Sequence, residues 1–109
     1  METLIVLTTV GDRETALKIA RHLIDRRLAA CVNVLAPCTS VYRWQGKTEE
    51  AQEIPLLIKT RGEAYPQVEA AIRQVHPYEL PEIIAVPVQR GLPAYLQWVA
   101  SETTIQENG

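Results

Sequence analysis

The sequence of 109 residues contains no phenylalanine, one methionine and two cysteines, so its aromatic side chains are four tyrosines and two tryptophans. No apolar run approaches the roughly 20 residues that a membrane-spanning helix needs. At the amino terminus no basic segment precedes an apolar one, as a secretory signal would require. We therefore expect a cytoplasmic protein that has no membrane partner.

Motifs of several enzyme classes are also missing. There is no phosphate-binding loop, no glycine-rich dinucleotide turn and no nucleophile elbow, so we predict no catalytic residue and no enzymatic activity. The formal net charge of −2 and the isoelectric point near 5.7 argue against nucleic acid as a partner, because binding to a phosphate backbone favours a basic surface.

The two cysteines, Cys31 and Cys38, are too far apart for a disulfide if both lie on one strand. Seven extended residues span about 23 Å, whereas bridged Cα atoms lie within about 7 Å of each other. The same distance prevents the two thiols from chelating one ion together unless the chain folds back at Pro37. We expect two reduced thiols.

The longest feature of the sequence is a predicted β-hairpin over residues 29–61. Its first arm breaks at Ala36-Pro37-Cys38, its turn is Gln45-Gly46, and its second arm begins with acidic residues and ends in an apolar run. Each arm is more than twice the usual strand length of about five or six residues. The hairpin therefore overruns the small domain that starts it, and its overhang needs another surface, most simply a second copy of the chain.

Tyr42 and Trp44 share a face near the tip of this hairpin, because side chains two residues apart on a strand point the same way. Two large amphipathic aromatic side chains on an overhanging ribbon are typical of a contact between subunits. A stacking platform for nucleic acid is the alternative, but such platforms lie in a basic groove. Without a basic surround, we favour the intersubunit contact.

The remaining pattern predicts a strand over residues 3–10, a helix over 13–28, a second helix over about 63–76, a strand over 82–88 and a last helix over 92–101. With the hairpin, the order is strand, helix, strand, strand, helix, strand. That is the α+β ferredoxin-like, or split βαβ, arrangement. We predict an antiparallel sheet in the strand order 4-1-3-2, with both main helices on one face.

The composition agrees with a single domain over residues 1–109, since 47% hydrophobic and 22% charged residues are ordinary values for a globular chain. We expect residues 103–109 to form a polar tail that is loose unless a neighbouring chain holds it.

Pro55 lies on the predicted third, central strand, so it marks either a bulge or the place where the hairpin leaves the sheet's centre. The first helix is expected to bury one apolar face, formed by Leu17, Ala20, Ile24 and Leu28 with Ala16 and Leu23 alongside.

His76 is the residue whose type and position suggest chemistry. It ends the second predicted helix just before Pro77, and Tyr78, Glu79 and Glu82 follow. Imidazole and carboxylate groups are metal ligands; a histidine at the carboxyl end of a helix can instead cap free carbonyls or pack in the core. The predicted topology places Cys31 at the opposite end of the sheet from His76, so a site that uses both needs two subunits.

Four blocks of the sequence closely resemble the CutA family of divalent-cation-tolerance proteins, in order and with matching spacing. They are Ala29-Ala30-Cys31-Val32-Asn33, Thr39-Ser40-Val41-Tyr42-Arg43-Trp44-Gln45-Gly46-Lys47, Leu57-Ile58-Lys59-Thr60 and His76-Pro77-Tyr78-Glu79-Leu80-Pro81-Glu82. The resemblance runs from Leu4 to Trp98. Pro55 departs from the family's pattern, which has an ordinary apolar residue there.

The resemblance implies a compact homotrimer built by the long hairpins, similar to that of PII-type signalling proteins, and a response to divalent metal ions. It implies no enzymatic activity. We expect weak binding of Cu(II) or another divalent cation, and the metal-ligand candidates are Cys31, His76 and Glu79. Cys38 stands where the family varies and receives no role.

Two other functions remain open. A PII-like trimeric sensor would bind a small anionic metabolite in clefts between subunits, with Lys59 and Arg43 as candidate contacts. An acylphosphatase-type enzyme is built on the same fold, but this sequence lacks the glycine-rich catalytic turn of that class.

Overall fold

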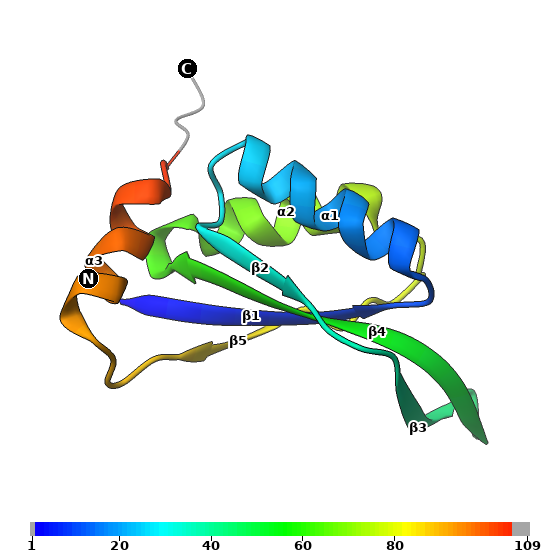
Figure 1. Ribbon diagram of the computed structural model, residues 1–109. Helices are drawn as coiled ribbons and strands as arrows, with labels where there is room; N and C mark the ends of the chain where they lie inside the picture. The colour runs from blue at the N-terminus through cyan, green and yellow to red at the C-terminus, as the bar shows by residue number, and fades with distance from the viewer. Residues whose placement is uncertain (1, 106–109) are drawn as a thin grey trace.

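The computed structural model describes residues 2–105. In chain order the elements are β1 (Thr3–Val10), α1 (Arg13–Asp25), β2 (Cys31–Val34), β3 (Cys38–Trp44), β4 (Lys47–Arg61), the 3-10 turn η1 (Gly62–Ala64), α2 (Tyr65–Val75), β5 (Ile84–Pro87) and α3 (Pro93–Glu102). The strands form one antiparallel sheet in the order β2-β4-β1-β5, with β3 paired to β4. Figure 1 shows α1 and α2 over one face of this sheet. The strand order and the helix placement match the prediction. Within the described residues, no helix is long and apolar enough to cross a membrane.

The core lies between the sheet and the two helices that cover it. Alternate residues of β1 and β4 point into it, because side chains alternate across a strand. The largest fully buried side chains are Ile19, Leu23, Leu28, Leu56, Ile58, Ile72, Val6, Val10, Val68, Val99, Thr8 and Thr60. Ile24 differs from the prediction: it is 39% exposed, because α1 buries the stripe of Ala16, Ile19, Ala20 and Leu23 and ends one residue later.

The helix ends follow local signals in the sequence. Asp12 caps α1, since its Oδ1 accepts a hydrogen bond of 2.7 Å from the Thr15 amide, and this bond holds the pKa of the Asp12 carboxyl below its usual value. At the other helix, Pro66 occupies the first turn of α2. His76, which precedes Pro77, has extended backbone angles and ends α2.

The long hairpin extends beyond the helices and bends away from the sheet (Figure 1). β4 contains 15 residues and has different neighbours along its length: its second half pairs with both β1 and β2, and its first half pairs with β3. The break between β2 and β3 spans residues 35–37, one residue earlier than predicted, because Cys38 already belongs to β3.

Pro55 lies opposite this break. The Leu35 amide donates to the Pro55 carbonyl at 3.0 Å. Because the N–H and C=O of a paired strand residue point to the same side, the N–H that Pro55 lacks would have faced the interrupted stretch. Pro55 is thus placed where the hairpin leaves the centre of the sheet, which is the second of the two predicted options.

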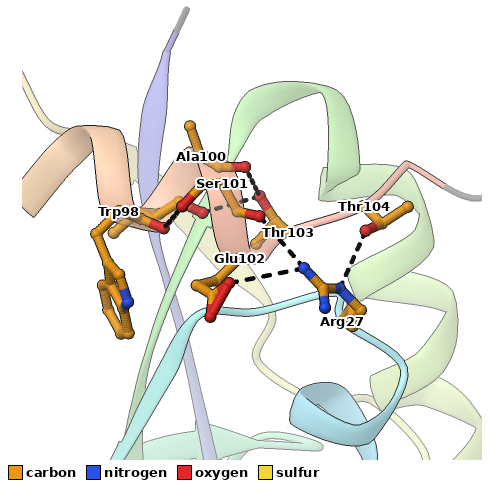
Figure 2. A network of polar contacts seen from close by, with 8 residues as sticks. Arg27, Trp98, Ala100, Ser101, Glu102, Thr103 and Thr104 are labelled. Carbon is orange, nitrogen blue, oxygen red and sulfur yellow. Dashed lines mark hydrogen bonds and ion pairs between the residues drawn. The ribbon is translucent and has the colours of Figure 1, made fainter.

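The first two residues of the predicted loose tail, Thr103 and Thr104, contact the rest of the chain. Figure 2 shows Arg27 reaching the end of α3. Its guanidinium donates to the Thr104 hydroxyl at 3.2 Å and to the Ser101 carbonyl at 3.3 Å, and it lies 3.6 Å from the Glu102 carboxylate. The Thr104 amide donates back to the Arg27 carbonyl, and Thr103 is buried. A polar composition alone could not reveal a partner so distant in sequence. Residues 106–109 lie outside the described part.

The hairpin turn generates a stability prediction. Gln45 and Gly46 both have positive φ, 49° and 80°, as a two-residue type I′ turn requires. Gly46→Ala is expected to lower the free energy of unfolding by about 1 kcal/mol, because a Cβ disfavours the left-handed region. Chemical denaturation measures the change. The control, Gln45→Gly, relieves the same kind of strain and is expected to leave stability unchanged or higher; an equal loss in both variants would contradict the prediction.

Candidate functional site

A cavity of about 800 Å³ opens between the long hairpin and the connector that follows α2. Its lining comes from one residue at the end of β1, five of β3, one of β4 and four of the connector: Thr9, Ser40, Val41, Tyr42, Arg43, Trp44, Glu53, Tyr78, Glu79, Leu80 and Glu82. The bend of the hairpin brings the two sequence-distant walls together.

Glu53 is the buried acidic group of this cavity, with 8% of its surface exposed. The Tyr78 hydroxyl donates to its Oε2 at 2.8 Å. Within residues 2–105 no lysine, arginine or histidine forms an ion pair with this carboxylate. Burial, and then the hydrogen bond to Glu53 and its charge, raise the pKa of Tyr78 to about 12. The raised pKa keeps the phenol protonated well above neutral pH, so the Tyr78 hydroxyl remains the donor in this bond.

The ring of His76 holds the start of the connector through two hydrogen bonds. Its Nδ1 accepts a hydrogen bond of 3.2 Å from the Tyr78 amide, so the ring proton resides on Nε2, which donates to the Thr9 carbonyl at 2.8 Å. The rings of His76 and Tyr78 also pack edge to face, with centroids 4.7 Å apart. In this arrangement the ring of His76 links the connector to the end of β1, and both ring nitrogens are engaged. A metal bound at Nδ1 would have to replace the Tyr78 amide.

The three predicted metal ligands are not brought together within one chain. Glu79 lines the cavity, whereas Cys31 lies opposite Lys59 on β4. The ring of His76 is bonded to Thr9, and Thr9 is paired with Pro55 on β4. Pro55 lies four residues, or about 13 Å, from Lys59 along that strand. The described part of the chain contains no group of three histidine, cysteine, aspartate or glutamate side chains that could hold a metal ion.

Cys31 lies instead beside α3. Burial of Tyr95, together with the nearby Cys31 thiol, raises the pKa of the Tyr95 phenol. Cys31 and Cys38 are both free thiols, as predicted. The expected separation of Cys31 from His76 is therefore present, and a site that uses both needs a second subunit.

Glu53 and its bond to Tyr78 are the features of this site that sequence reasoning missed. Glu53 reads as one of three glutamates in the acidic start of the second hairpin arm. The sequence does indicate the face on which Glu53 lies. Side chains alternate along a strand, so Glu53 shares a face of β4 with Pro55 and Leu57, and this face lies away from the helices. Its burial could not be read from the sequence, because the covering ring comes from Tyr78.

The sheet face without α1 and α2 carries two rows of side chains, which the strand registers define. One row is Cys31, Lys59, Ile5 and Val86, and the other is Asn33, Leu57, Leu7 and Ile84. The Lys59 ammonium donates to the Asn33 side chain, which makes the β2 end of both rows polar. The β1 and β5 end is apolar, with Ile84 52% and Val86 45% exposed.

Comparisons with known proteins agree on one family. A family model described as "CutA1 divalent ion tolerance protein" matches residues 4–102. The divalent-cation tolerance protein CutA of Thermus thermophilus is 46% identical over 99 residues, covering 91% of this chain and 96% of that protein. Mouse protein CutA is 44% identical over 92% of this chain, which spans 56% of the mouse protein. A crystal structure of CutA from Xylella fastidiosa superposes with a TM-score of 0.92 at 44% identity, covering 95% of this chain and all of that one.

The raised pKa of Tyr78 gives a prediction with a defined sign. The unfolded phenol ionises near pH 10 and the folded one at about 12, so the contribution of this group to stability is complete below pH 10 and is lost as the pH rises to about 12. In an ultraviolet titration of the tyrosines, Tyr78→Phe should remove the step of highest pH. It should also lower the free energy of unfolding at neutral pH by about 1 kcal/mol, through the lost hydrogen bond.

Tyr65→Phe is the matched control for that titration, because Tyr65 also donates to a carboxylate, that of Glu69. It is expected to leave the highest step in place. If the highest step survives in Tyr78→Phe, the bond between Tyr78 and Glu53 does not hold the phenol proton.

Proposed function

Because the chain belongs to the CutA1 divalent ion tolerance family, we propose that it is a divalent-cation-tolerance protein that binds copper or another divalent ion weakly at the subunit boundaries of a homotrimer. Its role is binding and not catalysis. The separation of the candidate ligands favours a site shared between subunits over one within a single chain, because one chain holds Cys31 at one end of the sheet and Glu79 at the other.

The open sheet face supports the trimer. Ile5, Leu7, Leu57, Ile84 and Val86 form an apolar area on the face of the sheet opposite to α1 and α2 (Figure 1). Contiguous exposed apolar patches on a soluble chain mark interaction sites. The hairpin adds further exposed apolar side chains at Val41, Tyr42 and Trp44. A neighbouring copy that packs on the open sheet face removes its apolar area from water.

The metal site follows from the same assembly. Thiolate and imidazole groups suit copper and zinc, and carboxylates add charge. Cys31 borders the open face, so docking a second copy there brings it toward groups of that copy. His76 joins such a site only if its bond to the Tyr78 amide opens, whereas Glu79 needs no such change.

The anionic-metabolite alternative gains no support. Lys59 is already bonded to Asn33, and Arg43 lines a cavity that also contains Glu53, Glu79 and Glu82. Three carboxylates beside one guanidinium disfavour an anion.

Relatives are described as chloroplastic in Arabidopsis thaliana and as periplasmic in Archaeoglobus fulgidus, so the predicted cytoplasmic location stays a prediction.

The trimer is tested by the mass of the protein in solution. The wild type is expected to be trimeric at micromolar concentration in analytical ultracentrifugation. Val86→Lys places a charge in the apolar area of the open face and is expected to shift the mass toward the monomer. Ile24→Lys, on the outer side of α1, makes the same change at a similarly exposed residue and should keep the trimer. A monomeric wild type, or equal dissociation of both variants, would refute the proposed interface.

Metal binding is tested by calorimetric titration of the trimer with Cu(II), and with Zn(II) to separate binding from thiol oxidation. Saturable binding is expected in the wild type. Cys31→Ser should weaken it at least tenfold, whereas Cys38→Ser, which removes the other free thiol, should not. Glu79→Gln is expected to weaken it by a smaller factor. No saturable binding in the wild type, or the same loss in both cysteine variants, would contradict the proposed site.

A further inference from the structure

We propose that the cavity between the hairpin and the connector binds a small organic cation, a primary ammonium group carried on an apolar body. The starting observation is Glu53, a carboxylate that is more than nine-tenths buried and lines the cavity. Its one hydrogen bond among the described residues comes from the neutral Tyr78 hydroxyl, and no cationic side chain there pairs with it. A buried charge is costly unless a group of opposite charge accompanies it.

The charges around Glu53 favour a positive ligand. The cavity lining carries three carboxylates, Glu53, Glu79 and Glu82, and one guanidinium, Arg43. An ammonium group supplies three donors, and the second oxygen of Glu53 is not used by Tyr78. A primary ammonium therefore supplies a charge opposite to that of Glu53 and donors for its second oxygen.

The aromatic lining favours an organic cation over a bare ion. Tyr42, Trp44 and Tyr78 all line the cavity. Tyr42 and Trp44 share one face of β3, because they alternate with Arg43 along the strand. Aromatic faces attract ammonium groups and also cover apolar carbon. The volume of about 800 Å³ lies within the roughly 300–1,000 Å³ of small-molecule sites.

A metal ion fits this cavity less well. Within residues 2–105 no three acidic, histidine or cysteine side chains converge closely enough to ligate one. The two proposed sites share Glu79 but depend on different groups, Cys31 for the divalent metal and Glu53 for the organic cation, so each can fail without the other.

The test uses the intact oligomer, with phenethylammonium chloride as the probe and 2-phenylethanol as a neutral compound of similar size. The two indole N–H signals in a nitrogen–proton correlation spectrum report the location, because Trp44 lines the cavity and Trp98 lies on α3. Phenethylammonium is expected to shift the Trp44 signal saturably and to leave Trp98 in place, and 2-phenylethanol to bind at least tenfold more weakly. The proposal is overturned if the Trp44 signal does not shift saturably. That result is expected when a basic side chain of a neighbouring copy fills the cavity. Equal binding of the neutral compound overturns it too.

A pair of variants tests the role of the buried charge. Glu53→Gln keeps the shape of the side chain and an oxygen for Tyr78, and it is expected to weaken phenethylammonium binding at least tenfold. Glu50→Gln removes the same charge from an exposed residue of the same strand that does not line the cavity, and it should change binding less than twofold. Equal effects of the two variants would show a response to net charge alone and overturn the assignment. Tyr78→Phe, which keeps the ring but frees the carboxylate, should retain binding.

Discussion

Backbone pairing along a single strand, β4, determines the arrangement of the rest of the structure. Its fifteen residues outrun the eight of β1, so β4 is central in the sheet over its second half and part of a two-stranded ribbon over its first half. The overhanging ribbon and the cavity beside it both follow from that difference in length. Within residues 2–105 the ribbon has no helix to pack on, and its bend creates one wall of the cavity.

The second wall depends on short polar contacts. The connector after α2 has no regular secondary structure to hold it, and its position is set by the ring of His76 and the hydroxyl of Tyr78. The first links it to the end of β1 and the second to β4. Hydrogen bonds of this kind are directional, so they position the connector in a way that apolar packing alone would not. The same bonds leave His76 with no free lone pair, which separates its structural role from the metal chemistry that its residue type suggests.

The parts of the fold that the sequence predicts are those that depend on neighbours in the chain. Gly46 marks the turn, the Ala36-Pro37 stretch marks the strand break, and the capping residue Asp12 marks the start of α1. What escapes prediction depends on distant partners: the ring of His76 engages a carbonyl 67 residues away, and Tyr78 covers a carboxylate 25 residues away. Of the candidate ligands, the sequence indicated that Cys31 and His76 lie apart, but it gave no sign that Glu53 is buried.

The paired ribbon also has a consequence for the colloidal behaviour of the chain. Beyond the end of β1, the outer edge of β4 presents unpaired backbone groups over residues 47–53 within the described structure. Such an edge is a template on which a strand of another molecule can add, and aggregation follows when nothing prevents it. Lys47, Glu49 and Glu50 occupy this edge. Their charges keep foreign strands away from this edge.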